Sequence, residues 1–302
     1  MPAQKITKAV IPAAGFGTRF LPQTKAMPKE MLPLVDKPII QHIVEQLVKA
    51  GITDIIIVTG YHKRSIEDHF DSPNQALLDA LLKGGKNKKH YLEEVERISK
   101  LANFYYLRQK GPKGNMTPLM NAKPLIGNES VIYTWADDFF DTGVNKNEFE
   151  QLILTYKKHN SSILGCYKTN KKEDYDKYGF ASGKYLGNGE LAVKNIQEKP
   201  GLHNTPSNLA VVSCYLYTPE LLQYFNEGLK LQKKYDDTEF IYTHVVEAAI
   251  KKGVKVIAKQ IKGGEYMDTG NKLSYLKTVV KFGLKDKQIG DLFKNYIKSL
   301  GL

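Results

Sequence analysis

Residues 8–19 read KAVIPAAGFGTR, and this stretch decides the fold. Residues 8–14 form a short apolar run of the kind found in a buried strand. A glycine-containing turn follows at 15–19, and residues 38–50 then carry apolar side chains at helical spacing. Residues 55–58, IIIV, are the next strand-like run. A strand, a glycine loop, a helix and a second strand in this order predict a parallel sheet flanked by helices.

The rest of the chain continues this alternation without an internal repeat or a long linker. Two segments are predominantly helical: a charged stretch at 72–100, expected as an insertion beside the sheet, and the C-terminal residues from 272 to 302. A further helix is predicted at 239–252. Strand-like runs occur at 104–107, 130–135, 162–167, 191–198, 210–217 and 254–261. We therefore predict an α/β domain over 1–285, with a Rossmann-like mixed, mostly parallel central sheet, and a helical tail over 286–302.

Composition excludes several classes of protein. The chain has 302 residues, of which 42% are hydrophobic and 25% charged, which is enough apolar material for a large core. No apolar run reaches the roughly 18–20 residues of a membrane helix, and the N-terminus lacks the pattern of a signal peptide. Cys166 and Cys214 form neither a disulfide framework nor a zinc motif, so we expect a cytoplasmic protein.

The net charge of +12 comes from 40 Lys and 4 Arg against 32 acidic residues. Such a surface attracts anions, whether nucleic acid, membrane phosphates or a polyanionic small substrate. The alternative is a compositional bias toward solvated lysines. Because the lysines are dispersed and no aromatic platform is interleaved with them, we expect neither a nucleic-acid nor a membrane partner.

A stiff basic loop follows the first strand. Residues 15–33 read GFGTRFLPQTKAMPKEMLP, with cations at Arg19, Lys25 and Lys29 and three prolines that exclude a regular helix and predict an extended loop. Its glycines allow backbone N–H groups to approach an anion closely. The pattern is neither GxGxxG nor GxxxxGK[ST], so neither a dinucleotide fold nor a P-loop is supported. The loop suits a triphosphate.

Carboxylates follow two other segments. Asp137 and Asp138 come directly after the apolar run at 130–135, where open α/β sheets bind ligands. Asp268 lies far away in the chain, in the turn-like triplet Asp268-Thr269-Gly270. Each could be only a turn or helix cap, but such side chains also suit Mg²⁺, which prefers oxygen ligands and phosphates.

Together these segments carry a resemblance. Residues 15–33 resemble the signature of sugar-1-phosphate nucleotidylyltransferases, and residues 25–38 resemble more narrowly the bacterial UTP–glucose-1-phosphate uridylyltransferases. The resemblance implies a fold of the nucleotide-diphospho-sugar transferase type and a Mg²⁺ cofactor. It also implies transfer of a uridylyl group from UTP to glucose 1-phosphate, giving UDP-glucose and pyrophosphate. It further implies a homodimer or homotetramer. The apolar positions of the C-terminal tail are compatible with packing either on the core or on a second subunit.

The resemblance also implies the roles of individual residues. It implies that the catalytic residues Arg19, Lys29 and Lys199 bind the reacting phosphates. It implies that Asp137 and Asp268 bind the metal ion. It places the nucleotide at Ala13, Ala14, Gly15, Gly17, Thr18, Lys25, Glu30, Gln109, Gly114 and Asp137. It places the sugar at Gly179, Glu198, Lys199 and Val211. Because the attacking sugar phosphate is already ionised at neutral pH, no general base is expected, and catalysis would consist of alignment and charge neutralisation.

Two segments depart from the family pattern. Residues 113–117 read KGNMT where the uridylyltransferases usually have Lys-Gly-Leu-Gly-His, and residues 238–243 read TEFIYT where Gly-Glu-Ile-Gln-Leu-Thr is usual. The phosphate and metal positions are intact. The departures leave open another sugar, dTTP in place of UTP, or a non-catalytic paralogue that binds a nucleotide sugar.

Overall fold

The computed structural model describes residues 4–301 of the chain. Residues 1–3 of the expected domain and residue 302 of the expected tail lie outside the described part. Within that part, no helix combines the length and the apolar character needed to cross a membrane.

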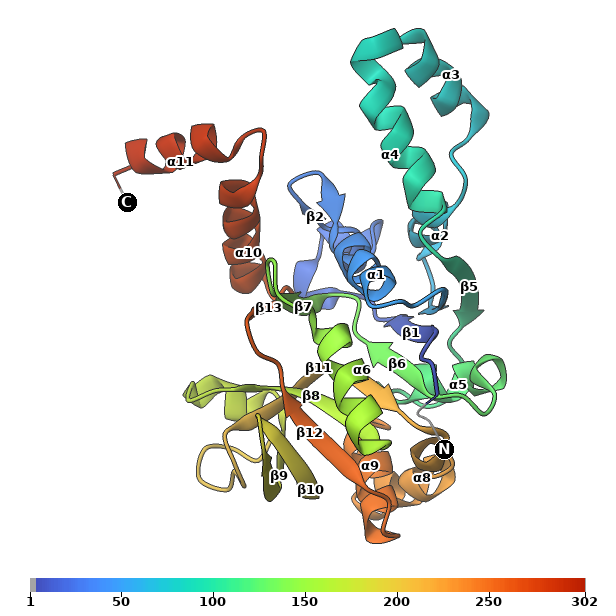
Figure 1. Cartoon of the computed structure of the whole chain (residues 1–302), viewed down its shortest axis with the longest axis vertical. Helices are drawn as coiled ribbons and strands as arrows, with labels where there is room; N and C mark the ends of the chain where they lie inside the picture. The colour runs from blue at the N-terminus through green and yellow to red at the C-terminus, as the bar shows by residue number, and fades with distance from the viewer. Residues whose placement is uncertain (1–3, 302) are drawn as a thin grey trace.

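A nine-stranded mixed sheet forms the centre of the molecule (Figure 1). From one edge to the other, its strands are β5 (Asn103–Arg108), β4 (Asp54–Thr59), β1 (Lys8–Ala13), β6 (Val131–Thr134), β11 (Leu209–Tyr217), β8 (Ser162–Lys168), β12 (Val256–Gln260), β10 (Glu190–Glu198) and β9 (Gly179–Gly187). Neighbours are parallel from β5 to β6 and between β8 and β12, whereas β11 and β10 run antiparallel to theirs. The predicted mixed α/β sheet is confirmed.

Each face of the sheet is covered by helices, because both faces of its central strands are apolar. In β1, Ala9 and Ile11 belong to one buried cluster and Val10 to the other, as expected when successive side chains point to opposite faces. The first cluster includes buried side chains of α1 (Ile39–Lys49) and α6 (Glu148–His159). The second includes those of α5 (Thr117–Ile126), α7 (Pro219–Leu222), α8 (Phe225–Lys234) and α9 (Tyr242–Lys251).

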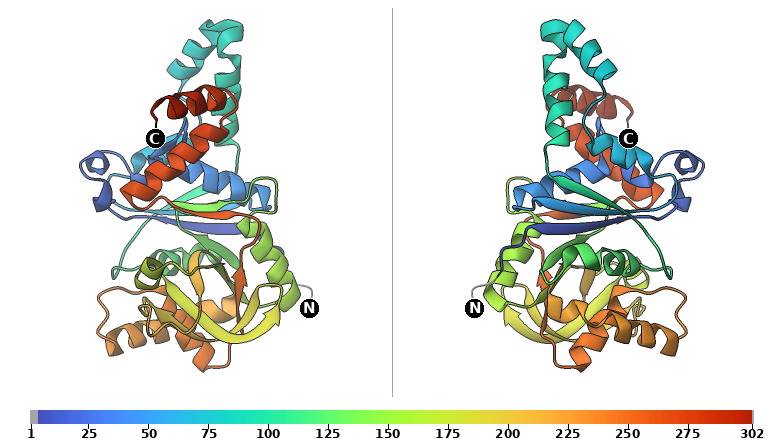
Figure 2. Two further views of the ribbon diagram at one scale, coloured as in Figure 1. Left: turned by 90° about the vertical axis from the view of Figure 1, so that its left-hand side faces the viewer. Right: turned by 90° about the vertical axis from the view of Figure 1, so that its right-hand side faces the viewer.

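Two helical pairs lie on the same side of the sheet (Figures 1 and 2). One consists of α3 (Gln75–Lys83) and α4 (Lys89–Ser99), reached through α2 (Arg64–Phe70). It was expected beside the sheet but projects away from it, because α3 buries no residue and α4 buries only Ile98. The other pair is α10 (Lys272–Lys285) and α11 (Gly290–Ser299), close to the C-terminus.

The basic loop differs from its prediction. Instead of remaining extended, residues 15–33 contain three 3₁₀ helices, η1 (Thr18–Phe20), η2 (Gln23–Lys25) and η3 (Lys29–Met31). The prolines still exclude an α-helix, but a single 3₁₀ turn needs so few backbone donors that it fits between them. Phe20 and Glu30 are buried and anchor the loop to the body.

A small second sheet, also unpredicted, positions the carboxylates. It pairs β7 (Asp138–Asp141) with β13 (Glu265–Asp268) in antiparallel fashion, so that Asp138 lies opposite Asp268. Another two-stranded sheet, β2 (Pro33–Leu34) with β3 (Lys37–Pro38), closes the basic loop.

Candidate active site

A cavity of about 870 Å³ opens where β5, β1 and β6 end. These strands are parallel, so their carboxyl ends meet at one edge of the sheet, which is where open α/β sheets bind ligands. Of the residues predicted from the sequence, those lining the cavity are Ala14, Gly15, Thr18, Arg19, Lys29, Glu30, Gln109, Gly114, Asp137, Lys199 and Asp268. The structure thus brings most of them into one space.

Other predicted residues lie behind or beside that cavity. Ala13 and Val211 are buried in the sheet. Gly17 adopts a left-handed φ of 65°, and a Cβ there would lie 3.2 Å from the Cβ of Lys29, so the glycine allows the two turns of the loop to pack. Lys25 is exposed at the end of η2 and does not line the cavity.

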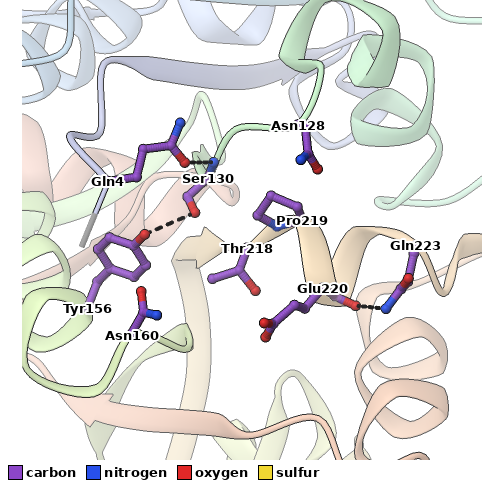
Figure 3. Close-up of a pocket in the computed structure, with 9 residues that line it drawn as sticks. All are labelled: Gln4, Asn128, Ser130, Tyr156, Asn160, Thr218, Pro219, Glu220 and Gln223. Carbon is purple, nitrogen blue, oxygen red and sulfur yellow. Dashed lines mark hydrogen bonds between the residues drawn. The ribbon is translucent and has the colours of Figure 1, made fainter. Parts of the chain in front are cut away.

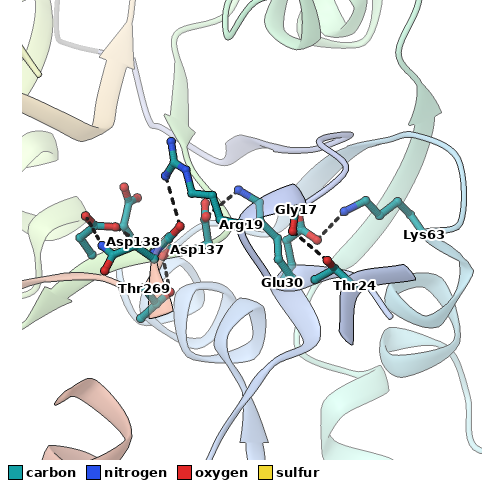
Figure 4. Close-up of polar contacts among 12 residues, drawn as sticks. Gly17, Arg19, Thr24, Glu30, Lys63, Asp137, Asp138 and Thr269 are labelled. Carbon is teal, nitrogen blue, oxygen red and sulfur yellow. Dashed lines mark hydrogen bonds and ion pairs between the residues drawn. The ribbon is translucent and has the colours of Figure 1, made fainter. Parts of the chain in front are cut away.

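Asp137 and Asp268 converge on a single point beside Gly270. A Cβ built on Gly270 would lie 3.1 Å from Asp268 Oδ1, 3.4 Å from Asp137 Oδ2 and 3.5 Å from Arg19 Nη1. Two hydrogen bonds hold this arrangement: the backbone N–H of Thr269 donates to the Asp137 carbonyl at 3.1 Å, and the side-chain Nη1 of Arg19 donates to the Gly270 carbonyl at 3.2 Å (Figure 4).

Lys29 faces the same carboxylates. Its Nζ lies 2.5 Å from Asp137 Oδ2, forming an ion pair at the cavity wall. Burial lowers the pKa of Lys29, but the carboxylates of Asp137 and Glu30 raise it more, so the net pKa lies above its usual value and the side chain stays charged.

At the cavity wall, Glu30 forms a buried ion pair of 2.6 Å with Lys63, which lies outside the lining, and 1% and 4% of their side chains are exposed. Glu30 Oε1 is buried without a hydrogen-bond partner among the described residues. Burial raises the pKa of Glu30, and Lys63 partly offsets this effect. Lys63 was not predicted from the sequence, although its position shortly after β4 places it at the ligand-binding edge of the sheet.

Asp138 is a third carboxylate beside the converging pair. Burial and the neighbouring charge of Asp137 raise its pKa well above the usual range, and Tyr266 donates a hydrogen bond of 2.7 Å to its Oδ2. Tyr178 similarly donates to Asp268 Oδ2 at 3.3 Å. These hydrogen bonds restrict the orientation of both carboxylates.

The residues present fit a divalent cation only in part. Asp137 and Asp268 provide the hard oxygen ligands that Mg²⁺ prefers. Across residues 4–301, however, no group of three or more His, Cys, Asp or Glu side chains is arranged to hold a metal. A cation here would therefore need further oxygen ligands from a phosphate or from solvent, which is typical of Mg²⁺.

Two of the predicted sugar-binding residues, Glu198 and Lys199, border a second space of about 550 Å³, which shares Lys199 and Glu239 with the main cavity. Gly179 and Val211 do not line it. Glu198 lines it, and burial raises the pKa of this carboxyl to about 7, although Lys199 opposes the shift. A Cβ on Gly179 would meet the Tyr242 hydroxyl at 2.0 Å and Glu198 Oε2 at 3.1 Å, so only glycine leaves room for both side chains.

The two segments that depart from the family pattern contact each other. Asn115 Oδ1 accepts a hydrogen bond of 2.9 Å from the N–H of Tyr242, the first residue of α9. The N–H of Phe240 donates to the Lys113 carbonyl at 2.7 Å, and a Cβ on Gly114 would lie 2.0 Å from the Phe240 carbonyl oxygen. This backbone contact keeps residues 239–241 out of the helix that was predicted from 239 onward.

A further polar cavity, of about 380 Å³, lies at the opposite edge of the sheet, where Ser130 and Gln4 precede β6 and β1. Figure 3 shows its lining, in which Ser130 donates to Tyr156 at 3.3 Å. It contains none of the predicted site residues and no charged side chain other than Glu220. The chemistry therefore gathers at the carboxyl edge.

Comparison with known proteins agrees with this placement. The family model described as "Nucleotidyl transferase" matches residues 8–283. This chain belongs to the nucleotidyl transferase family. Among its relatives, the UTP–glucose-1-phosphate uridylyltransferase of Staphylococcus epidermidis is 42% identical over 99% of this chain and 100% of the relative. That of Staphylococcus haemolyticus is 41% identical over 99% of each chain.

Solved structures of nucleotidyl transferase family members share the fold. A UDP-glucose pyrophosphorylase complexed with UDP-glucose has a TM-score of 0.81 and 35% identity, and the match covers 93% of this chain and 100% of that one. A UTP-bound pyrophosphorylase from Acinetobacter baumannii has a TM-score of 0.86 and 32% identity, covering 98% of this chain and 100% of that one. The family resemblance inferred from residues 15–38 is confirmed.

Proposed function

We propose that this protein transfers the uridylyl group of UTP to glucose 1-phosphate, releasing pyrophosphate and forming UDP-glucose. Its relatives are named for this activity, and each match covers almost the whole length of both chains. The observation that carries the proposal is the convergence of Asp137, Asp268 and Arg19 on one point under the glycine loop. Anionic phosphates need such an arrangement of cations and metal-binding carboxylates in order to approach each other.

The basic loop would hold the triphosphate. The backbone N–H groups of residues 14–18 are available to the phosphates, and Arg19 and Lys29 supply positive charge at the cavity wall. Arg19 can form two parallel hydrogen bonds to a phosphate, whereas Lys29 acts as a point charge. Both would stabilise the pyrophosphate that leaves as the bond to the α-phosphorus breaks.

Lys199 and Glu198 would hold the sugar phosphate on the other side. Lys199 borders both spaces and would pair with the phosphate, while Glu198 lines the space beside it and would accept hydrogen bonds from sugar hydroxyls. The phosphate oxygen is already ionised and attacks the α-phosphorus directly, so the residues need only align and neutralise the reactants. No residue is required to remove a proton.

A Mg²⁺ ion would be held by Asp137 and Asp268, the pair that the backbone brings together at Gly270. When bound, such an ion neutralises phosphate charge and draws the reacting phosphates together. Glu30 would contact the base or ribose with its unpaired oxygen, and Gln109 and Gly114 would contact the base from the same cavity. The two free cysteines, Cys166 and Cys214, and the phosphorylated substrates favour a cytoplasmic location.

The direct experiment is a panel of nucleoside triphosphates and sugar 1-phosphates, assayed by pyrophosphate release with and without Mg²⁺. We expect UTP with glucose 1-phosphate to be the preferred pair and Mg²⁺ to be required. Lys199→Ala and Asp137→Ala should each lose about a hundredfold or more in turnover, because one charge-assisted contact to a transition state contributes roughly 3–4 kcal/mol. Retained turnover in a folded variant would contradict the assigned role.

One alternative has a structural observation in its favour. The Asn115–Tyr242 hydrogen bond joins the two segments that depart from the family pattern, and Asn115 lines the main cavity, so another sugar or dTTP is the second candidate substrate. The same panel decides between them, since a preference for dTTP or another sugar phosphate would replace the first proposal. A non-catalytic role is disfavoured, because Arg19, Lys29, Asp137 and Asp268 all line the cavity.

A further inference from the structure

Lys29 forms an ion pair with the Asp137 carboxylate oxygen that a metal ion would need as a ligand. Its ammonium group lies 2.5 Å from Asp137 Oδ2, the same atom that lies 3.4 Å from the Cβ position of Gly270 where the two carboxylates converge (Figure 4). The Asp137 side chain is only 16% exposed, so little of it remains open to another cation. The ion pair therefore competes directly with metal binding at this carboxylate.

Asp268 is held differently. Its Oδ1 accepts a hydrogen bond of 2.9 Å from the N–H of Gly270, and its Oδ2 accepts longer bonds from Tyr178 at 3.3 Å and Asn271 at 3.4 Å. These donors are neutral, and each carboxylate oxygen has lone pairs left for a metal ion. Of the two carboxylates, only Asp137 is paired with a full positive charge at hydrogen-bond distance.

A lysine ammonium and a divalent cation cannot both sit on one carboxylate oxygen without strong mutual repulsion. At a separation of about 4 Å even unit charges interact by several kcal/mol near a protein surface, and a divalent ion doubles the effect. Lys29 must therefore move away before Asp137 can bind a metal tightly. An anionic phosphate beside Lys29 offers the ammonium an alternative partner, because both groups line one cavity.

We propose that Lys29 blocks Asp137 in the nucleotide-free protein and is drawn off by the triphosphate, so that the divalent cation binds tightly only together with the nucleotide. This inference rests on the proposed function, because it takes the triphosphate and the Asp137–Asp268 pair from it. Lys29 exchanges one anionic partner for another and remains charged throughout. Its displacement couples occupation of the phosphate site to opening of the metal site.

The test is a titration of the nucleotide-free protein with Mn²⁺, in which binding is measured by calorimetry or by the electron paramagnetic resonance of the free ion. Wild type should bind Mn²⁺ weakly, and Lys29→Met should bind it at least about tenfold more tightly, since a positive charge beside the ligand is removed. Lys25→Met is the matched control, because it removes a lysine from the same loop that does not touch the carboxylates. Its affinity should stay within about twofold of wild type.

Two results would overturn the inference. One is unchanged Mn²⁺ affinity in Lys29→Met, and the other is equal tightening in Lys29→Met and Lys25→Met, which would show a general effect of net charge. Lys29→Gln serves as a second uncharged variant if Lys29→Met folds poorly. Lys29→Arg, which keeps the charge, should remain as weak as wild type.

The titration also separates this inference from the proposed function. It uses no substrate, so its outcome does not depend on which nucleotide or sugar the protein uses, which the substrate panel measures. In the Lys29→Met background, adding Asp137→Asn should abolish the gained Mn²⁺ affinity. If the double variant binds as tightly as Lys29→Met, the ion lies elsewhere and the proposed metal site fails along with the inference.

Discussion

In the Glu30–Lys63 pair, one lysine outside the cavity lining compensates the charge of a cavity carboxylate and fixes its orientation. Both groups are almost fully buried, and each compensates the charge of the other in a place where water cannot. Glu30 keeps one oxygen free of hydrogen bonds within the described chain. Its orientation toward the cavity therefore depends on the lysine that holds the other oxygen.

Lys63→Met should destabilise the protein by about 3–5 kcal/mol, because it leaves Glu30 as an unpaired buried charge. Denaturant unfolding measures this loss, and adding Glu30→Gln should restore most of it. The control is Lys89→Met, which removes an exposed pair with Glu93 and should cost less than about 1 kcal/mol. Equal losses in the two single variants would mean that the buried pair is not a stabilising contact.

Glu198 links the sugar space to pH. Its pKa is raised to about 7 by burial, so its carboxylate fraction falls as the pH drops below 7. Sugar hydroxyls donate hydrogen bonds to a carboxylate, so the KM for glucose 1-phosphate should rise about tenfold for each pH unit below 7. The substrate phosphate also titrates in this range, and Glu198→Gln provides the correction. The variant should show the smaller slope that belongs to the substrate alone, whereas equal slopes would remove Glu198 from sugar binding.

The residues of the cavity could be predicted where both their type and their position in a motif indicated phosphate or metal binding. Arg19, Lys29, Asp137 and Asp268 line one cavity, as expected from a basic glycine loop and strand-end carboxylates. Lys63 was not predicted, because a lone lysine after a strand looks like any solvated lysine until its burial is seen. The family roles of these residues remain predictions for the experiments above.

Secondary-structure elements differ in how well they can be predicted from the sequence. The strands and helices with long apolar patterns, such as β1, β4 and α1, occur where they were predicted. β7 and β13 have only four residues each, which is too short for a periodic pattern to stand out. Their pairing still brings Asp137 and Asp268 together, so the element that assembles the site was the one least visible in the sequence.

Helix α9 begins with a cap supplied from a distant loop. The Asn115 side chain accepts a hydrogen bond from the N–H of Tyr242. An N–H group in the first turn of a helix has no partner within the helix itself. Asn115→Leu, which removes this acceptor, should therefore cost about 1–2 kcal/mol of stability, measured by denaturant unfolding. Asn115→Asp keeps the acceptor and should retain most of the stability. Full stability of Asn115→Leu would show that the hydrogen bond contributes nothing.

At the scale of the whole molecule, large apolar side chains are exposed along both C-terminal helices, α10 and α11. On α10 and α11, exposed side chains follow one another at spacings of three or four residues. They are Leu273, Leu276, Val280, Leu284, Leu292, Tyr296 and Leu300. Contiguous exposed apolar side chains of this kind usually mark a protein interface. We infer that this surface joins copies of the chain into a homodimer or homotetramer.

Light scattering coupled to gel filtration should therefore give the mass of two or four chains. The double variant Leu276→Glu, Leu292→Glu should dissociate to monomers, because charges would then be buried in the interface. Leu154→Glu, on α6 and 50% exposed, is the matched control and should leave the assembly intact. A wild-type monomer would contradict the inference.

At this scale the sequence predicted the class of fold but not the arrangement of its parts. The alternation of strands and helices indicated a mixed sheet, yet the order of strands depends on contacts between distant segments, such as β6 with β11. The helical insertion was recognisable from its charge, but its projection away from the body follows from how few of its side chains find a partner there.

The close approach of Gly114 to the backbone of Phe240 constrains how this scaffold can be re-engineered. A chimera that replaces Asn115 would lose the side-chain acceptor of the Tyr242 N–H, and one that replaces Gly114 would bring a Cβ against the Phe240 carbonyl. The two segments therefore pack backbone against backbone across more than a hundred intervening residues, and changes in either one act on the other. Directed evolution toward new sugar nucleotides should accordingly randomise them in the same library.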